Sequence, residues 1–143
     1  MGLIQIGAPA PSFKGMNLTG PEIDSENYKG KKPVVLIFSS TRIDPAQINA
    51  VKAMWTKNRD KAEIITVSFK LPGVSAAKTF MMSLGAKFPA IYDPSQAIYQ
   101  AFGVETPVAI VIIDAAGNVV HAAQALETKD TQALQDAIAK SIP

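Results

Sequence analysis

Three stretches of mostly apolar residues set the hydrophobic pattern of this 143-residue chain. They cover residues 34–38 (VVLIF), 62–69 (AEIITVSF) and 108–113 (VAIVII), and each is rich in β-branched side chains. Runs of this length and composition are typical of strands that are buried on both faces of a sheet. We therefore expect the first strand to lie centrally, beside both of the others.

Helical spacing of apolar residues occupies much of the remaining chain. It predicts four helices, over residues 45–58, 75–84, 95–102 and 130–142. Gly85 and Gly103 directly follow the second and third helices, which is where glycine commonly ends a helix. These helices alternate with the strands, so the pattern indicates the α/β class, with a central mixed sheet flanked by helices on both faces.

The remaining segments are extended or turned. Residues 8–13 form an extended lead-in, because proline moves the residue before it out of the helical region. Residues 13–18 and 22–24 predict an N-terminal hairpin, residues 88–94 a short extended piece, and residues 119–123 an antiparallel strand after a turn at 116–118. We expect residues 1–143 to form one domain.

Composition narrows the classes of function. Apolar residues make up 48% of the chain and charged residues only 18%, which is typical of a globular protein. The net charge of +2 is spread out, with Lys29, Lys31 and Lys32 as the one local cluster, so we expect no nucleic-acid surface. No apolar run is long enough to cross a membrane, and the first residues do not resemble an intact signal peptide. The cellular compartment stays open.

The polar stretch after the first buried run is the candidate site. Asp44 is a preferred residue for capping a helix, and Pro45 is favoured at the first helical position. We expect the Asp44 carboxylate to accept the N–H of Ala46 or Gln47. In open α/β sheets, ligands bind where a buried strand ends and a helix begins.

This stretch resembles the active-site segment of the redoxin branch of the thioredoxin-like proteins. In the thioredoxins of cytochrome maturation a strand like residues 34–38 leads into WCxPC, and the two cysteine positions then fall on Ile43 and Ala46. In peroxiredoxins of the alkyl hydroperoxide reductase/thiol-specific antioxidant type the loop carries TxxCP. Thr41 to Pro45 fit that motif with Asp44 at the cysteine position.

Further landmarks of the redoxins occur in the same order along the chain. The segments of this chain that resemble them are GAPAPSF at 7–13, YKGK at 28–31, FP with a following Asp at 88–93, AFGV at 101–104 and IID with a following Gly at 112–117. The resemblance implies a thioredoxin-like fold. Thioredoxin-like proteins usually carry a cis-proline before the third buried strand, but here Val108 falls at that position and Pro107 lies one residue earlier. Either the loop is shifted by one residue or the cis-proline is missing, as it is in peroxiredoxins.

The chain contains no cysteine, so we expect no thiol–disulfide exchange and no peroxide reduction, both of which need a thiolate. We interpret the chain as a protein-binding or structural module with no catalytic residues and no cofactor. An extended segment of a partner protein would bind at the loops that carry Thr41, Arg42, Thr106, Pro107 and Val108. The oligomeric state stays open.

Two enzymatic alternatives remain. The first is a thiol-dependent redoxin whose cysteines were replaced by engineering. The peroxiredoxin alignment, with Asp44 at the cysteine position, fits this alternative better than the alignment with Ile43, because Ile is not a usual replacement for Cys. The second is an enzyme that uses the hydroxyls of Ser39, Ser40 and Thr41. It lacks a base, because the one histidine, His121, lies on a distant strand. The sequence offers no metal-ligand spacing and no glycine-rich phosphate loop.

Overall fold

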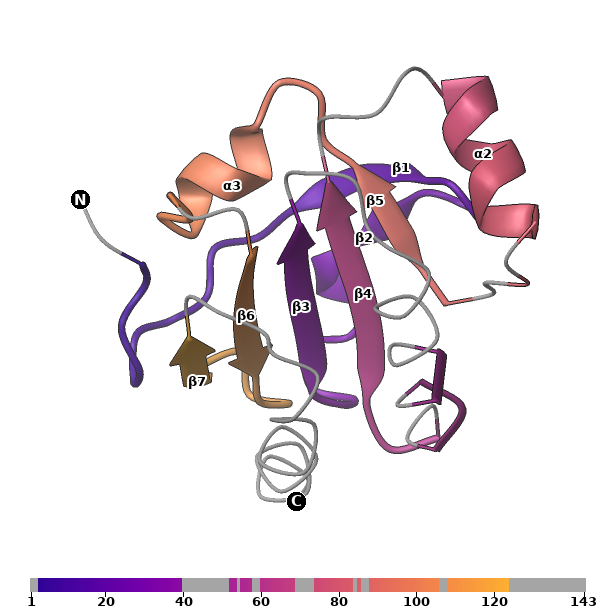
Figure 1. The fold of residues 1–143 in the computed structure, drawn as a ribbon. Coiled ribbons are helices and arrows are strands. Elements are labelled where there is room, and N and C mark those ends of the chain that lie inside the picture. Colours follow the sequence, from indigo (N-terminus) through magenta and orange to yellow (C-terminus); the bar gives the residue numbers. More distant parts are fainter. Residues whose placement is uncertain are drawn as a thin grey trace.

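The computed structural model describes residues 3–39, 52–53, 55–57, 60–68, 74–83, 85, 88–105 and 108–123. They contain seven strands, two α-helices and one 3-10 helix, η1 (Figure 1). In chain order they are β1 (Lys14–Asn17), β2 (Ile23–Asp24), η1 (Ser25–Asn27), β3 (Val34–Ser39), β4 (Glu63–Ser68), α2 (Val74–Ser83), β5 (Ala90–Tyr92), α3 (Ala97–Ala101), β6 (Val108–Ile113) and β7 (Val119–Ala123).

The strands form one mixed sheet in the order β2-β1-β5-β4-β3-β6-β7. Strand β3 lies in its interior between β4 and β6, parallel to β4 and antiparallel to β6. The expectation that the three apolar runs would be neighbouring interior strands is confirmed. The expected α/β class is confirmed as well.

Both faces of the central strands are buried. On one face Leu36, Phe38 and their neighbours pack against α3, where the Phe102 ring lies 5.7 Å from the Phe38 ring. On the other face Val35, Ile64 and Ile112 are completely buried. The burial of alternating residues on both faces explains why these strands read as continuous apolar runs.

Two of the four predicted helices fall mostly or wholly outside the described residues. Of residues 45–58, only 52–53 and 55–57 are described, and these are helical. The helix predicted at 130–142 lies outside the described residues.

Helices α2 and α3 correspond to the predicted helices at 75–84 and 95–102. Gly85 and Gly103 follow them with φ values of +66° and +67°, as the sequence predicted. Helix α3 begins two residues later than predicted. Its start is determined by Asp93, whose carboxylate accepts the backbone N–H groups of Ile98 and Tyr99.

The predicted N-terminal hairpin is present as β1 and β2, which pair antiparallel. The sequence did not predict that β1 also pairs with β5 and so extends the central sheet. The Asn17 amide oxygen joins the two, because it accepts N–H groups from both Thr19 and Ala90. Gly15 makes the close approach possible, since a Cβ atom there would lie 2.3 Å from Ile91.

The N-terminal lead-in runs beside β7, which is the last strand of the sheet (Figure 1). The Gly7 N–H donates to the Val119 carbonyl, and the Ala10 N–H donates to the Gly117 carbonyl. The lead-in therefore covers part of an edge that would otherwise present unpaired backbone groups.

Candidate functional site

The carboxyl end of β3 and the amino end of β6 meet at one edge of the sheet, where Ser39 pairs with Val108. The loops that follow residue 39 and precede residue 108 therefore leave the sheet from neighbouring points. These are the two loops in which the sequence places the site. Within the predicted partner-binding set, Val108 is the first residue of β6.

The other predicted site residues lie outside the described residues. They are Thr41, Arg42, Ile43, Asp44, Pro45, Ala46, Thr106 and Pro107. The helix cap at Asp44 and the role of Arg42 thus stay predictions. Whether the loop before β6 holds a cis-proline stays open.

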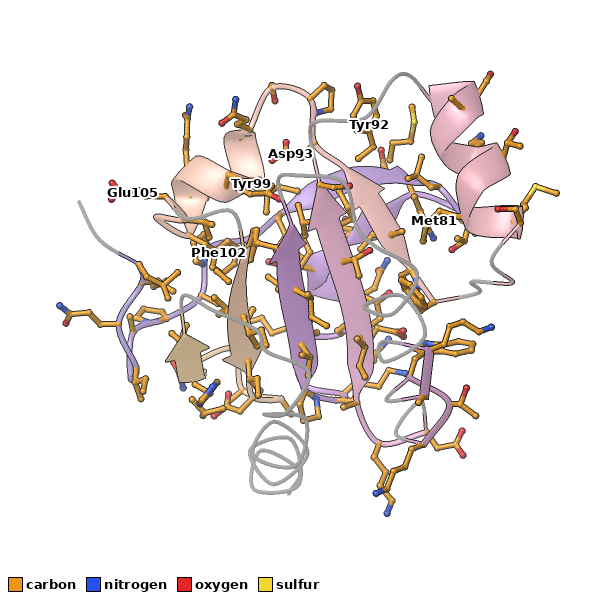
Figure 2. The ribbon with its side chains drawn as sticks, in the orientation of Figure 1. Met81, Tyr92, Asp93, Tyr99, Phe102 and Glu105 are labelled. Carbon is orange, nitrogen blue, oxygen red and sulfur yellow. The ribbon has the colours of Figure 1, made fainter. Side chains whose placement is uncertain are left out.

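The described residues at this edge form a well-packed base. Tyr99 of α3 donates its hydroxyl to the Val67 carbonyl over 2.7 Å, and its ring meets the Phe38 ring edge-on with centroids 5.1 Å apart. Tyr99 thus ties α3 to the ends of both β3 and β4. Figure 2 shows Tyr99 and Asp93 at the end of the sheet towards which β3 and β4 run.

Asp93 is the buried carboxylate of this region, with 6% of its surface exposed. One of its oxygens accepts two backbone N–H groups of α3, as described above, and its own N–H donates to the Ser68 carbonyl. This carboxylate is engaged in capping, which suits it poorly to act as a base. Glu105, on the segment that leads to position 106, is exposed.

His121 lies far from the end of β3. On β7 it pairs with Ile112 of β6, and Ile112 in turn pairs with Val35, four positions before Ser39 on β3. Four strand residues span about 13 Å. His121 is therefore too distant to act as a base for a hydroxyl at position 39, which argues against the serine-type alternative.

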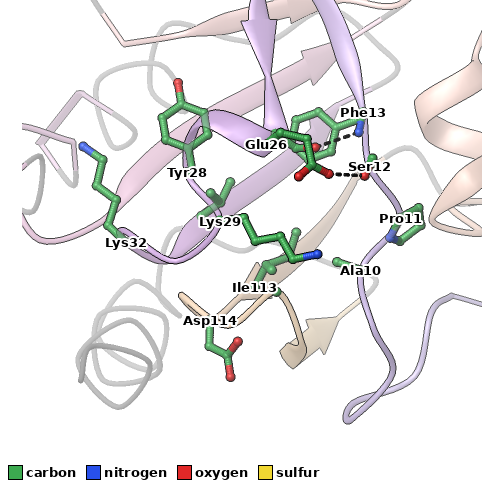
Figure 3. Close-up of a pocket in the computed structure, with 13 residues that line it drawn as sticks. Ala10, Pro11, Ser12, Phe13, Glu26, Tyr28, Lys29, Lys32, Ile113 and Asp114 are labelled. Atoms are coloured by element: carbon green, nitrogen blue, oxygen red, sulfur yellow. Dashed lines mark hydrogen bonds between the residues drawn. The ribbon is translucent and has the colours of Figure 1, made fainter.

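A small surface pocket lies at the opposite end of the sheet (Figure 3). Its walls come from residues 10–13, from the turn with Tyr28 and Lys29, and from residues 113–117. Three of the redoxin landmarks thus meet here. The Ser12 hydroxyl donates to the Glu26 carboxylate, and the Lys29 stem packs where a Cβ atom on Gly117 would contact it.

Glu63 makes the main charged interactions among the described residues at this end of the sheet. It pairs with Lys32 over 3.3 Å and accepts the indole N–H of Trp55. Burial of the Tyr28 phenol and the nearby Glu63 carboxylate both raise the pKa of Tyr28 above its usual value of 10.0. We interpret these contacts as structural, because they join the turn and residue 55 to the sheet.

Two further features concern the described residues only. No group of three or more His, Cys, Asp or Glu side chains within them could hold a metal ion. None of their helices is long and apolar enough to span a membrane.

The fold defines a thioredoxin-like protein. Over 98% of the chain it superposes on a protein described as a thiol:disulfide interchange protein DsbE, from Chlorobium tepidum, with a TM-score of 0.85, 21% identity and 99% of that chain covered. The mitochondrial 2-Cys peroxiredoxin of Plasmodium falciparum gives a TM-score of 0.78 at 16% identity, covering 95% of this chain and 93% of the peroxiredoxin. At these identities the likeness shows the fold alone.

Sequence comparison then shows the family. Residues 6–122 match the model of the AhpC/TSA family. The thiol-disulfide oxidoreductase ResA of Bacillus anthracis is 32% identical over 130 residues, which are 89% of this chain and 74% of ResA. The chain belongs to the AhpC/TSA family, and the redoxin resemblance drawn from its motifs is confirmed. Unlike thiol-dependent members, it carries no cysteine.

Sequence reasoning missed the supporting residues of the site, Tyr99 and Asp93. A signal for Asp93 was present, because Asp followed by Pro just before a helical pattern favours a cap. The hydroxyl contact of Tyr99 had no local signal, since its partner Val67 lies on a strand far away in the sequence.

Proposed function

We propose that this chain is a binding module on the redoxin fold, which holds an extended segment of a partner protein and performs no thiol–disulfide exchange or peroxide reduction. The observation that carries the proposal is the absence of cysteine from a chain that otherwise matches its family over residues 6–122. Both reactions begin with attack by a thiolate, and no other side chain provides an equivalent nucleophile.

The paired ends of β3 and β6 support the location of the binding site. Two loops that leave the sheet side by side, above a base fixed by Tyr99 and Phe38, can present backbone groups and side chains to an extended chain. Arg42 follows β3 by three residues. Its guanidinium can hold a carboxylate or a backbone carbonyl of the bound segment.

A displayed library of random linear peptides tests this proposal. We expect selection on the unmodified chain to enrich peptides whose binding is lost with Arg42→Glu. Lys61→Glu is the matched control, because it makes the same charge reversal at an exposed residue just before β4, at the opposite end of the sheet. Peptides that bind both variants as well as the parent would contradict the proposed site.

The second candidate is a thiol-dependent redoxin whose cysteines were replaced. It is favoured by the 32% identity to ResA, a thiol-disulfide oxidoreductase by name. The codons at positions 43, 44 and 46 of the native gene distinguish the two candidates. Cysteine codons there would replace our proposal with the enzymatic one.

A further inference from the structure

The sulfur atoms of this chain belong to its five methionines, because it has no cysteine. Three of them lie in the described residues, and their environments differ sharply. Met82 is 77% exposed and Met16 is 49% exposed, whereas Met81 is 5% exposed. Met81 and Met82 are neighbours on α2. The thioether of Met81 is therefore buried in the protein, whereas that of Met82 lies in solvent.

A thioether reacts with hydroperoxides without prior deprotonation. The sulfur lone pair attacks one oxygen of the peroxide, the O–O bond breaks, and a sulfoxide and an alcohol or water are formed. The sulfur loses two electrons and the peroxide gains them. No low pKa and no base is required, so access of the peroxide to the sulfur is the property that the fold controls.

From this contrast we infer that Met82 is a site of reversible oxidation by hydroperoxides, with Met16 as a slower second site and Met81 protected by the fold. A sulfoxide at position 82 adds a polar group in water and leaves the core intact. The same group at position 81 would place an unpaired polar atom in a buried position, which destabilises a protein.

Peptide mapping after limited treatment with hydrogen peroxide tests the inference. Trypsin releases Met81 and Met82 together in residues 79–87, and fragment ions between them assign the added oxygen. Met16 falls in residues 15–29, apart from Met1 and Met54. We expect the rate of oxidation to fall in the order Met82, Met16, Met81, with Met82 at least severalfold faster than Met81.

Unfolded chain in urea is the control for intrinsic reactivity. There, Met81 and Met82 should oxidise at similar rates, so that the difference in the native protein reports the fold. Met82→Leu should abolish the early product in residues 79–87, and Met81→Leu should leave it unchanged. Equal rates at the two sites in the folded chain would overturn the inference.

Two further readouts test the consequences. Chain oxidised at Met82 should keep its circular dichroism spectrum and its thermal midpoint. A mixture of the two stereospecific methionine sulfoxide reductases, supplied with a dithiol that is oxidised to its disulfide, should restore the thioether and release water. A lower midpoint after oxidation at Met82, or a sulfoxide that resists both reductases, would contradict a tolerated and reversible modification.

Discussion

At the scale of single residues, the junction between β1 and β5 depends on two side-chain identities. Asn17 supplies one acceptor for two backbone N–H groups, and Gly15 leaves room for Ile91. Neither role follows from local sequence, because the partner strand lies more than 70 residues further along the chain. The sequence predicted the hairpin itself through its turn residues.

Gly15→Ala tests this close approach. The new Cβ would lie 2.3 Å from Ile91, so we expect a loss of about 1–3 kcal/mol in the free energy of unfolding. Gly20→Ala is the matched control, because a Cβ there meets only the Asn17 side-chain nitrogen at 3.4 Å. Urea denaturation measures both. Equal stabilities of the two variants would show that β1 does not dock tightly on β5.

Tyr28 predicts a dependence of stability on alkaline pH. Its pKa is raised in the folded chain, so above pH 10 the unfolded state loses this proton first and the folded state becomes less stable. Below pH 10 both states are protonated and the effect is absent. We expect Tyr28→Phe to reduce the alkaline loss of stability, measured by urea denaturation from pH 9 to pH 11. Parallel curves for parent and variant would contradict the shift.

At the scale of elements, α3 is the structure that supports the candidate site. Its first turn is capped by Asp93, and Tyr99 joins it to β4 and to Phe38. The helical pattern predicted this helix, and the residues around its start explain the difference in its boundary. Gln96 adopts a positive φ of 61°, which keeps it out of the helix.

Asp93→Ala should remove the cap of α3 and cost about 0.5–2 kcal/mol of stability. Asp93→Asn retains a side-chain oxygen that can accept the N–H groups of Ile98 and Tyr99, so we expect a smaller loss. Thermal or urea unfolding ranks the variants. If Asn were as harmful as Ala, the negative charge of Asp93 rather than its acceptor oxygen would be the important property.

At the scale of the whole molecule, the order of β4, β3 and β6 followed from the sequence because these three strands are buried on both faces and therefore appear as apolar runs. The closeness of the two points at which the site loops leave the sheet did not follow from local pattern. It depends on the pairing of Ser39 with Val108, which the antiparallel register of β3 and β6 sets. The family resemblance placed the loops together, and the register of the strands agrees with it.

Introducing cysteines at the candidate site tests whether it retains the architecture of a redoxin site. In the variant Ile43→Cys with Ala46→Cys, the first thiolate would lie near the N-terminus of the predicted helix. We expect this to lower its pKa below the usual value of about 8.5, with Asp44 opposing the shift by like-charge repulsion. Thiolate absorbance against pH measures it. A pKa at or above the free-cysteine value would contradict the proposed register.

The central claim is that the unmodified chain performs no thiol-dependent turnover. The most direct measurement follows insulin disulfide reduction and hydrogen peroxide consumption under excess dithiol, with and without the chain. We predict no acceleration of insulin reduction over the dithiol alone, and peroxide loss above the dithiol-only background that stops once the accessible methionines are oxidised. Sustained turnover of either substrate, many molecules per chain, would contradict the claim and show a catalytic group that the cysteine-free sequence does not reveal.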